Sequence, residues 1–204
     1  MGTGPGCCHA GVMGIARFAT ASLIFLLCAG GVSRADPLFD PTTGLRMSAY
    51  RAPVPPTVPG GQVVTDPARV ARLADSGALL IDVMGAAGYR IRDDGTWITA
   101  ESHQTLPGAI WLPEIGRGRQ EPAIAAYMHQ ALQMCSEGRK DRPIVIFCLS
   151  DCWMSWNAVQ HVAAAGYSRV FWFPGGTDMW QLMDMPTRTA VPLPFGARHC
   201  ATRN

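Results

Sequence analysis

The chain has 204 residues, which is long enough to bury one good hydrophobic core and short for two. Its hydrophobic fraction of 48% and charged fraction of 16% are typical of a folded protein and exclude an intrinsically disordered one. The formal net charge is only +2, so we expect small molecules or proteins as partners and no nucleic acid.

The first 35 residues have the features of a secretory signal peptide. Arg17 precedes an apolar run over 18–32, and Ser33 and Ala35 place small residues where signal peptidase cleaves. We expect cleavage after Ala35 and a periplasmic location. A membrane-spanning helix is the alternative, but the run is short of the roughly 20 apolar residues needed. Cleavage would remove two of the 17 basic residues and none of the 15 acidic ones, so the mature chain would have 15 of each. Because the apolar run leaves with the signal peptide, we expect no stable membrane span in the mature protein.

Cysteine usage points to an oxidising compartment for the mature part of the chain. Three of the seven cysteines leave with the signal segment, and four remain: Cys135, Cys148, Cys152 and Cys200. Four cysteines permit three disulfide pairings, among which the sequence does not choose.

The segment 36–61 is rich in proline and turn residues, so we expect an extended arm over the surface. A disordered linker is the alternative. Apolar side chains could anchor the arm to the domain, and they are Leu38, Phe39, Leu45, Met47 and Tyr50.

The segment 62–187 alternates strand and helix signals. Thr65 is a candidate helix cap, and the continuous apolar run 78–83 indicates a strand buried on both faces. The later predicted elements are a β-hairpin of 89–92 and 96–99, a strand at 109–112, a helix at 124–135, a strand at 144–147, a helix at 153–165, a strand at 170–173 and a helix at 178–183. This order predicts an α/β fold with a central, mostly parallel sheet flanked by helices. The tail 188–204 has no clear period and is expected to be irregular.

Cys148 follows a buried strand and shortly precedes a helix, where open α/β sheets place their ligands. We expect an exposed thiol there, whose thiolate the helix N-terminus stabilises. An inert buried thiol is the alternative. Cys152 is a static disulfide partner, a resolving thiol or a metal ligand; two sulfurs alone make an incomplete zinc site, so we expect no metal.

Several short motifs occur in a characteristic order. Ile-Val-Ile-Phe-Cys at 144–148 is followed by Ala-Ala-Ala-Gly-Tyr at 163–167 and by Gly-Gly at 175–176. Upstream stand Leu-Ile-Asp-Val at 80–83 and Leu-Pro-Gly-Ala-Ile at 106–110. Together these segments resemble the rhodanese domain. The resemblance implies a rhodanese-like fold, and it places Cys148 at the family's persulfide-forming cysteine.

The loop after Cys148 departs from the family pattern. It reads Leu149-Ser150-Asp151-Cys152 and ends in Trp153, where rhodanese loops usually end in an arginine that binds the anionic sulfur donor. Asp151 adds a negative charge to the loop, and Met84 stands where many members carry arginine. We therefore expect anionic donors such as thiosulfate to bind poorly.

A narrower resemblance involves Cys-x-x-x-Cys-Trp at 148–153 together with Thr-Gly-Leu-Arg at 43–46 and Tyr-Arg-Ala-Pro at 50–53. These motifs are similar to those of exported proteins associated with alcohol oxidation dependent on pyrroloquinoline quinone. The resemblance implies a quinone-dependent dehydrogenase system as a candidate partner. It assigns no cofactor to this chain.

Three functions remain open on these residues. The leading hypothesis is a thiol-disulfide protein in which Cys148 attacks a disulfide or sulfur donor and Cys152 resolves the adduct. The second is a sulfurtransferase that carries a persulfide on Cys148, and the third is a non-catalytic module that binds a cofactor or partner. The candidate site comprises Cys148 and Cys152 as reactive groups, Leu149, Ser150, Asp151 and Trp153 in the loop, and Asp82 and Trp156 as supporting residues. Trp153 either packs in the core, covers the sulfurs or stacks on a ligand.

Overall fold

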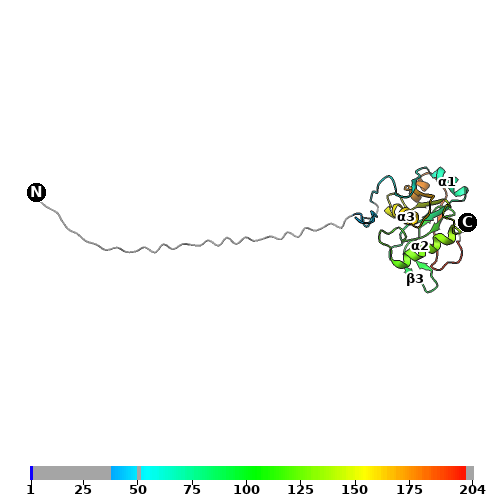
Figure 1. Ribbon diagram of the computed structural model, residues 1–204. Helices are drawn as coiled ribbons and strands as arrows, with labels where there is room; N and C mark the ends of the chain where they lie inside the picture. Colours follow the sequence, from blue (N-terminus) through cyan, green and yellow to red (C-terminus); the bar gives the residue numbers. More distant parts are fainter. Residues whose placement is uncertain (2–37, 50–51, 201–204) are drawn as a thin grey trace. The chain divides into compact units, whose positions relative to one another are not determined.

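The computed structural model describes Met1 and residues 38–49 and 52–200 (Figure 1). The predicted signal peptide therefore lies outside the described residues, apart from Met1. Tyr50 and Arg51 of the arm also lie outside them. Among the described residues, no helix is long and apolar enough to cross a bilayer.

The predicted helices and strands are present in the described chain, and the structure adds three short strands that the sequence did not predict, at 62–63, 104–105 and 188–189. In chain order the elements are β1 (Gln62–Val63), α1 (Pro67–Asp75), β2 (Leu79–Asp82), β3 (Arg90–Ile91), β4 (Trp97–Ile98), β5 (Gln104–Thr105), β6 (Ile110–Trp111), α2 (Pro122–Cys135), β7 (Ile144–Phe147), α3 (Trp153–Ala164), β8 (Val170–Phe173), α4 (Gly176–Leu182) and β9 (Arg188–Thr189).

A five-stranded sheet in the order β1-β8-β7-β2-β6 forms the centre of the domain, and every neighbouring pair in it is parallel. The predicted parallel α/β fold is confirmed. The strands β2, β7 and β8 are buried along their whole length, which explains their continuous apolar sequences. The central strand β7 pairs with β2 and β8. Cys148, the residue after β7, therefore lies at the carboxyl end of the sheet, in the middle of its width.

Helices cover both faces of this sheet. Ile144 and Ile146 of β7 pack in one apolar cluster with residues of α2 and α3. Val145 and Phe147, which point to the other face, pack in a second cluster with residues of α1 and α4. Figure 1 shows α1 and α2 on opposite sides of the sheet. The domain is therefore a three-layer structure with two apolar cores.

Several element boundaries differ from the sequence predictions, among them the starts of two helices. Asp66 caps α1, because its Oδ1 accepts a hydrogen bond of 2.9 Å from the amide of Ala68; the predicted cap was Thr65. The fixed φ of Pro67 suits the first helical position, which makes the residue before it the cap. Helix α4 begins at Gly176, two residues before the predicted start.

The C-terminal tail has structure that its sequence does not reveal. Its strand β9 pairs antiparallel with β5, and Leu193 donates a backbone hydrogen bond of 2.9 Å to the carbonyl of Trp111. Cys200 forms a disulfide with Cys135 at the end of α2. These partners are distant along the chain, so no local periodicity indicates them.

The described part of the arm is anchored to α3. Arg46 is only 2% exposed, and its backbone exchanges hydrogen bonds of 2.9 and 2.8 Å with the side-chain amide of Asn157. Trp156 donates from Nε1 to the carbonyl of Thr57 at 2.8 Å, and its ring meets Phe39 edge to face. The helix that follows the cysteine loop therefore also holds the arm.

Candidate functional site

Cys148 and Cys152 form a disulfide at the carboxyl end of the parallel sheet. Cys148 directly follows β7, and Cys152 is the N-cap residue of α3. Their Cα atoms are 6.1 Å apart, within the roughly 4.4 to 6.8 Å that a disulfide requires. The structure therefore selects one of the three possible pairings of the four cysteines, in which Cys148 is bonded to Cys152 and Cys135 to Cys200.

Both sulfurs of this disulfide are covered. Cys148 is 0% exposed and Cys152 is 3% exposed, so the expectation of an exposed Cys148 thiol is wrong for the disulfide form. The Sδ of Met84 lies 3.7 Å from the Sγ of Cys148. Trp153 and Met154, in the first turn of α3, are buried in the same apolar cluster as both cysteines. The strand end is open in the topology, but neighbouring side chains close it.

The start of α4 holds the cysteine loop in place. The amide of Thr177 donates to the carbonyl of Cys148 at 2.9 Å, and the hydroxyl of Ser150 donates to the carbonyl of Gly175 at 2.9 Å. The amide of Ser150 donates to the carboxylate of Asp178 at 3.0 Å. This loop amide is therefore bound to a carboxylate of the protein and is not directed at an external anion.

The exposed part of the loop carries negative charge. Asp151 is exposed and has a φ of +58°, in the left-handed region that aspartate tolerates better than most residues. Leu149 is half-buried and packs against the core. Asp151 and Asp178 thus place two carboxylates on or against one short loop, an arrangement that disfavours the approach of an anionic donor.

Asp82 supports the site through Met84. It is 0% exposed, and its Oδ1 accepts a hydrogen bond of 2.9 Å from the amide of Met84, whose sulfur contacts Cys148. Its Oδ2 lies 2.6 Å from Nε2 of His103, and the imidazole ring packs near Trp111. The sequence analysis did not assign His103 to this site. The only signal in the sequence was its place just before the motif at 106–110.

The two tryptophans have different roles. Trp153 is 3% exposed, and its Nε1 has no hydrogen-bond partner among the described residues. Its burial with both cysteines matches the interpretations in which it packs in the core or covers the sulfurs. Trp156 is directed to the arm through Thr57 and is not brought to the disulfide.

A pocket of about 330 Å³ approaches the disulfide from the β2 side. Met84 lines this pocket and its sulfur also contacts the sulfur of Cys148, so this residue is shared by the pocket and the disulfide. Arg117 at the pocket is bound by Glu114 through hydrogen bonds of 2.7 and 3.3 Å. Within the described part of the chain, no group of three or more His, Cys, Asp or Glu residues is placed to hold a metal ion.

Comparison with known proteins gives the following similarities. The model of the Rhodanese-like domain matches residues 66–183, more than half of the chain. The solved structure of a thiosulfate sulfurtransferase from Pseudomonas aeruginosa has a TM-score of 0.44 and 18% identity, over 67% of this chain and 22% of that one. The polysulfide-sulfur transferase homodimer from Wolinella succinogenes has a TM-score of 0.38 and 12% identity, over 63% and 79% of the two chains.

A full-length protein from Lactobacillus plantarum has a TM-score of 0.36 and 17% identity, over 59% of this chain and 84% of its own. This chain thus spans only 22% of the length of the Pseudomonas structure. No protein with a curated description matches it in sequence. The family model covers α1 through α4 and includes the cysteine loop and the buried strands β2, β7 and β8. The chain therefore belongs to the rhodanese-like domain family.

Proposed function

We propose that this chain is a periplasmic rhodanese-like protein that exchanges thiols and disulfides through Cys148 and Cys152. The observation that carries this proposal is the disulfide between them at the N-terminal end of α3, where amide dipoles favour a thiolate. The dithiol form would therefore hold one sulfur ready as a nucleophile and a second sulfur within bonding distance.

The proposed reaction is two successive thiol-disulfide exchanges. The Cys148 thiolate attacks a partner disulfide, forms a mixed disulfide and releases one partner thiolate. Cys152 then loses its proton and attacks the Cys148 sulfur, which forms the Cys148–Cys152 disulfide and releases the second partner thiolate. Two electrons pass from the dithiol to the partner disulfide, and the two thiol protons go to solvent or to the released thiolates. The reverse sequence oxidises a partner dithiol.

Access to the sulfurs requires movement of the loop 149–151 and of the side chains that cover the disulfide, Met84 among them. The disulfide form buries both sulfurs, whereas Asp151 is exposed and Ser150 is held by hydrogen bonds to Gly175 and Asp178. Breaking these contacts would release the loop, and displacement of the Met84 side chain would then uncover the sulfur of Cys148. We infer that partner binding and loop displacement occur together.

Sulfur transfer is the second candidate, because the chain belongs to the rhodanese-like family and Cys148 stands at the end of β7. In this reaction the Cys148 thiolate takes a sulfane sulfur from a donor, becomes a persulfide and passes the sulfur to a thiol acceptor. It ranks second for two reasons. The Ser150 amide is bound to Asp178 and is not directed at a bound anion, and Cys148 is bonded to Cys152 where a persulfide carrier needs a free thiol.

The proposed cellular context is export to the periplasm and an accessory role in quinone-dependent alcohol oxidation. The signal-like first 35 residues and the two disulfides support the location. The motifs at 43–46, 50–53 and 148–153 support the context. The proposed partners are a protein thiol or disulfide, or a small-molecule sulfur donor.

Replacing one cysteine at a time should distinguish the two sulfurs. When Cys152→Ser is reduced and exposed to a mixed aromatic disulfide, we expect a stable adduct on Cys148, because the resolving thiol is gone. Cys148→Ser should form no such adduct at a comparable rate. In the wild-type protein the adduct on Cys148 should form only transiently, before the Cys148–Cys152 disulfide replaces it. Intact-protein mass spectrometry with peptide mapping measures all three.

The same measurement separates the candidate functions. Wild-type protein that is first reduced and then treated with polysulfide should lose two hydrogen atoms at Cys148 and Cys152 in the redox mechanism. A persistent added sulfur on Cys148 would favour sulfur transfer. If the bond neither reduces nor exchanges in the folded protein, the redox proposal is wrong and a non-catalytic binding module becomes the better account. The Cys135–Cys200 bond serves as the internal reference in each sample.

Thiosulfate should be a poor donor for this protein. Asp151→Asn removes one loop charge while keeping a residue that tolerates the left-handed backbone, so we expect persulfide formation from thiosulfate to rise by up to about fivefold. Asp93→Asn, on an exposed site away from the loop, should leave the rate unchanged. Fast turnover of thiosulfate by the wild-type protein would place sulfur transfer first.

A further inference from the structure

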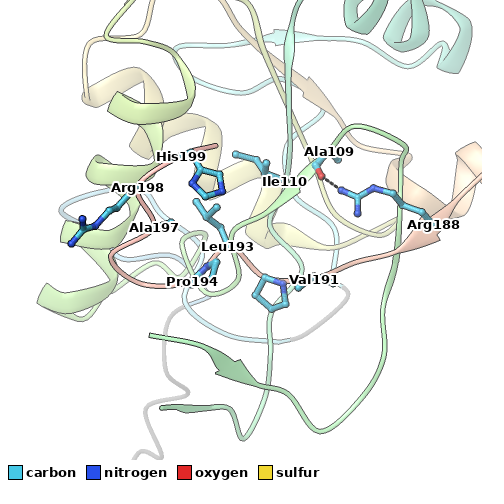
Figure 2. Close-up of a pocket in the computed structure, with 10 residues that line it drawn as sticks. Ala109, Ile110, Arg188, Val191, Leu193, Pro194, Ala197, Arg198 and His199 are labelled. Atoms are coloured by element: carbon cyan, nitrogen blue, oxygen red, sulfur yellow. Dashed lines mark hydrogen bonds between the residues drawn. The ribbon is translucent and has the colours of Figure 1, made fainter. Parts of the chain in front are cut away.

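A second pocket, separate from the cysteine loop, lies between the C-terminal tail and the start of β6. Its volume is about 300 Å³, at the lower end of the range for small-molecule sites. Figure 2 shows Ile110 and Leu193 in its middle, Arg188 with Ala109 on one side and His199 on the other. The tail residues from Val191 onward therefore form one wall and the edge of the sheet forms the other.

The walls of this pocket are mostly apolar. The apolar side chains that line it are Ala109, Ile110, Val191, Pro192, Leu193, Pro194 and Ala197. Among the described residues that line it, the charged groups are Arg188 and Arg198, and none is a carboxylate. An apolar body and an anionic head would therefore both find matching surroundings.

Arg188 is the group that selects for an anion. Its guanidinium donates to the backbone carbonyls of Ala109 and Thr189, and neither acceptor is charged. Its buried Nε has no hydrogen-bond partner among the described residues, and none of their carboxylates pairs with this arginine. Of the five N–H donors of a guanidinium, Nε is buried, and Nη1 and Nη2 each keep one N–H beyond the two carbonyl bonds, so Arg188 has two donors left for a ligand.

The tail disulfide holds the wall of the pocket. Cys200 follows His199 directly, and its bond to Cys135 ties this end of the tail to α2. At the other end, Leu193 donates its amide to Trp111 and Ala190 donates its amide to His103. The wall is fixed on both sides before a ligand arrives, which reduces the ordering cost of binding.

We propose that this pocket binds a small carboxylic acid with a short apolar body, its carboxylate directed at Arg188. The space holds roughly ten water-sized groups, which suits an acid the size of hexanoate. The site is independent of the Cys148–Cys152 chemistry, so neither proposal depends on the other.

Calorimetric titration with four probes tests this assignment on the purified, oxidised protein. Hexanoate should bind at least about tenfold more tightly than hexanol or hexylammonium, because a charge-assisted hydrogen bond contributes that much. Acetate, which lacks the apolar body, should show no measurable binding. Amide chemical-shift changes on hexanoate addition should map to Ile110, Leu193 and Ala197.

Variants of lining residues make the test specific. Val191→Asp places a carboxylate in the pocket at an exposed position, so it should remove hexanoate binding and weaken hexanol binding much less. Arg188→Gln should weaken hexanoate binding about tenfold or more. Arg139→Gln, an exposed arginine that does not line the pocket, should have no effect. The proposal is overturned if hexanoate fails to bind, if hexanol binds equally well, or if Val191→Asp leaves hexanoate affinity unchanged.

Discussion

Removing the Cys135–Cys200 disulfide is expected to lower the free energy of unfolding by about 4 kcal/mol. The bond joins residues separated by 65 positions, so it removes much loop-closure entropy from the unfolded chain. It also fixes the tail against the end of α2, where Cys135 is only 3% exposed. Urea unfolding of the double variant Cys135→Ser/Cys200→Ser, compared with the oxidised wild-type protein, measures the loss.

The second disulfide is the matched control for this prediction. Cys148 and Cys152 are separated by only four positions, so the same entropy argument gives a loss of about 2 kcal/mol for Cys148→Ser/Cys152→Ser. The tail bond should therefore be the main structural bond and the loop bond the smaller contributor. Equal losses, or a larger loss at the loop, would contradict the separation into a structural and an exchanging disulfide.

Gly176→Ala should destabilise the protein by about 2 to 4 kcal/mol and speed reduction of the Cys148–Cys152 bond. Gly176 has a φ of +51°, and a Cβ on it would lie 2.1 Å from the carbonyl oxygen of Cys148. Because that neighbour is backbone, the cysteine loop or the start of α4 must shift. The shift would weaken the hydrogen bonds from Thr177 to Cys148 and from Ser150 to Asp178.

A second glycine separates the backbone cost from the clash. Gly77 has a φ of +87°, and a Cβ there would meet nothing within 4 Å. Gly77→Ala should therefore cost only the roughly 1 to 2 kcal/mol of the left-handed conformation and leave the reduction rate unchanged. Stopped-flow reduction by dithiothreitol and urea unfolding measure both variants. If the two alanine variants behave alike, contact with α4 does not hold the cysteine loop closed.

Local sequence signals were enough to predict the long strands and the helices of the domain and the place of Cys148. The apolar runs at 78–83 and 144–147 become β2 and β7, and the run at 170–173 is β8. These signals are local, because a strand buried on both faces needs apolar residues at every position. The same locality places Cys148 at the end of a central strand and just before α3.

The surroundings of that cysteine depend on contacts between segments that are distant along the chain. Met84 contacts the sulfur of Cys148 and lies 64 positions away from it along the chain. Asp178 accepts the hydrogen bond from the amide of Ser150 and lies 28 positions away from it. The pairing of Cys135 with Cys200 and of β5 with β9 likewise joins segments that are distant along the chain. Periodicity reports which face of its own element a residue occupies, but not which side chain of another element covers it. The burial of Cys148 and the carboxylic-acid pocket under the tail both depend on such distant contacts, and for this physical reason neither follows from the sequence.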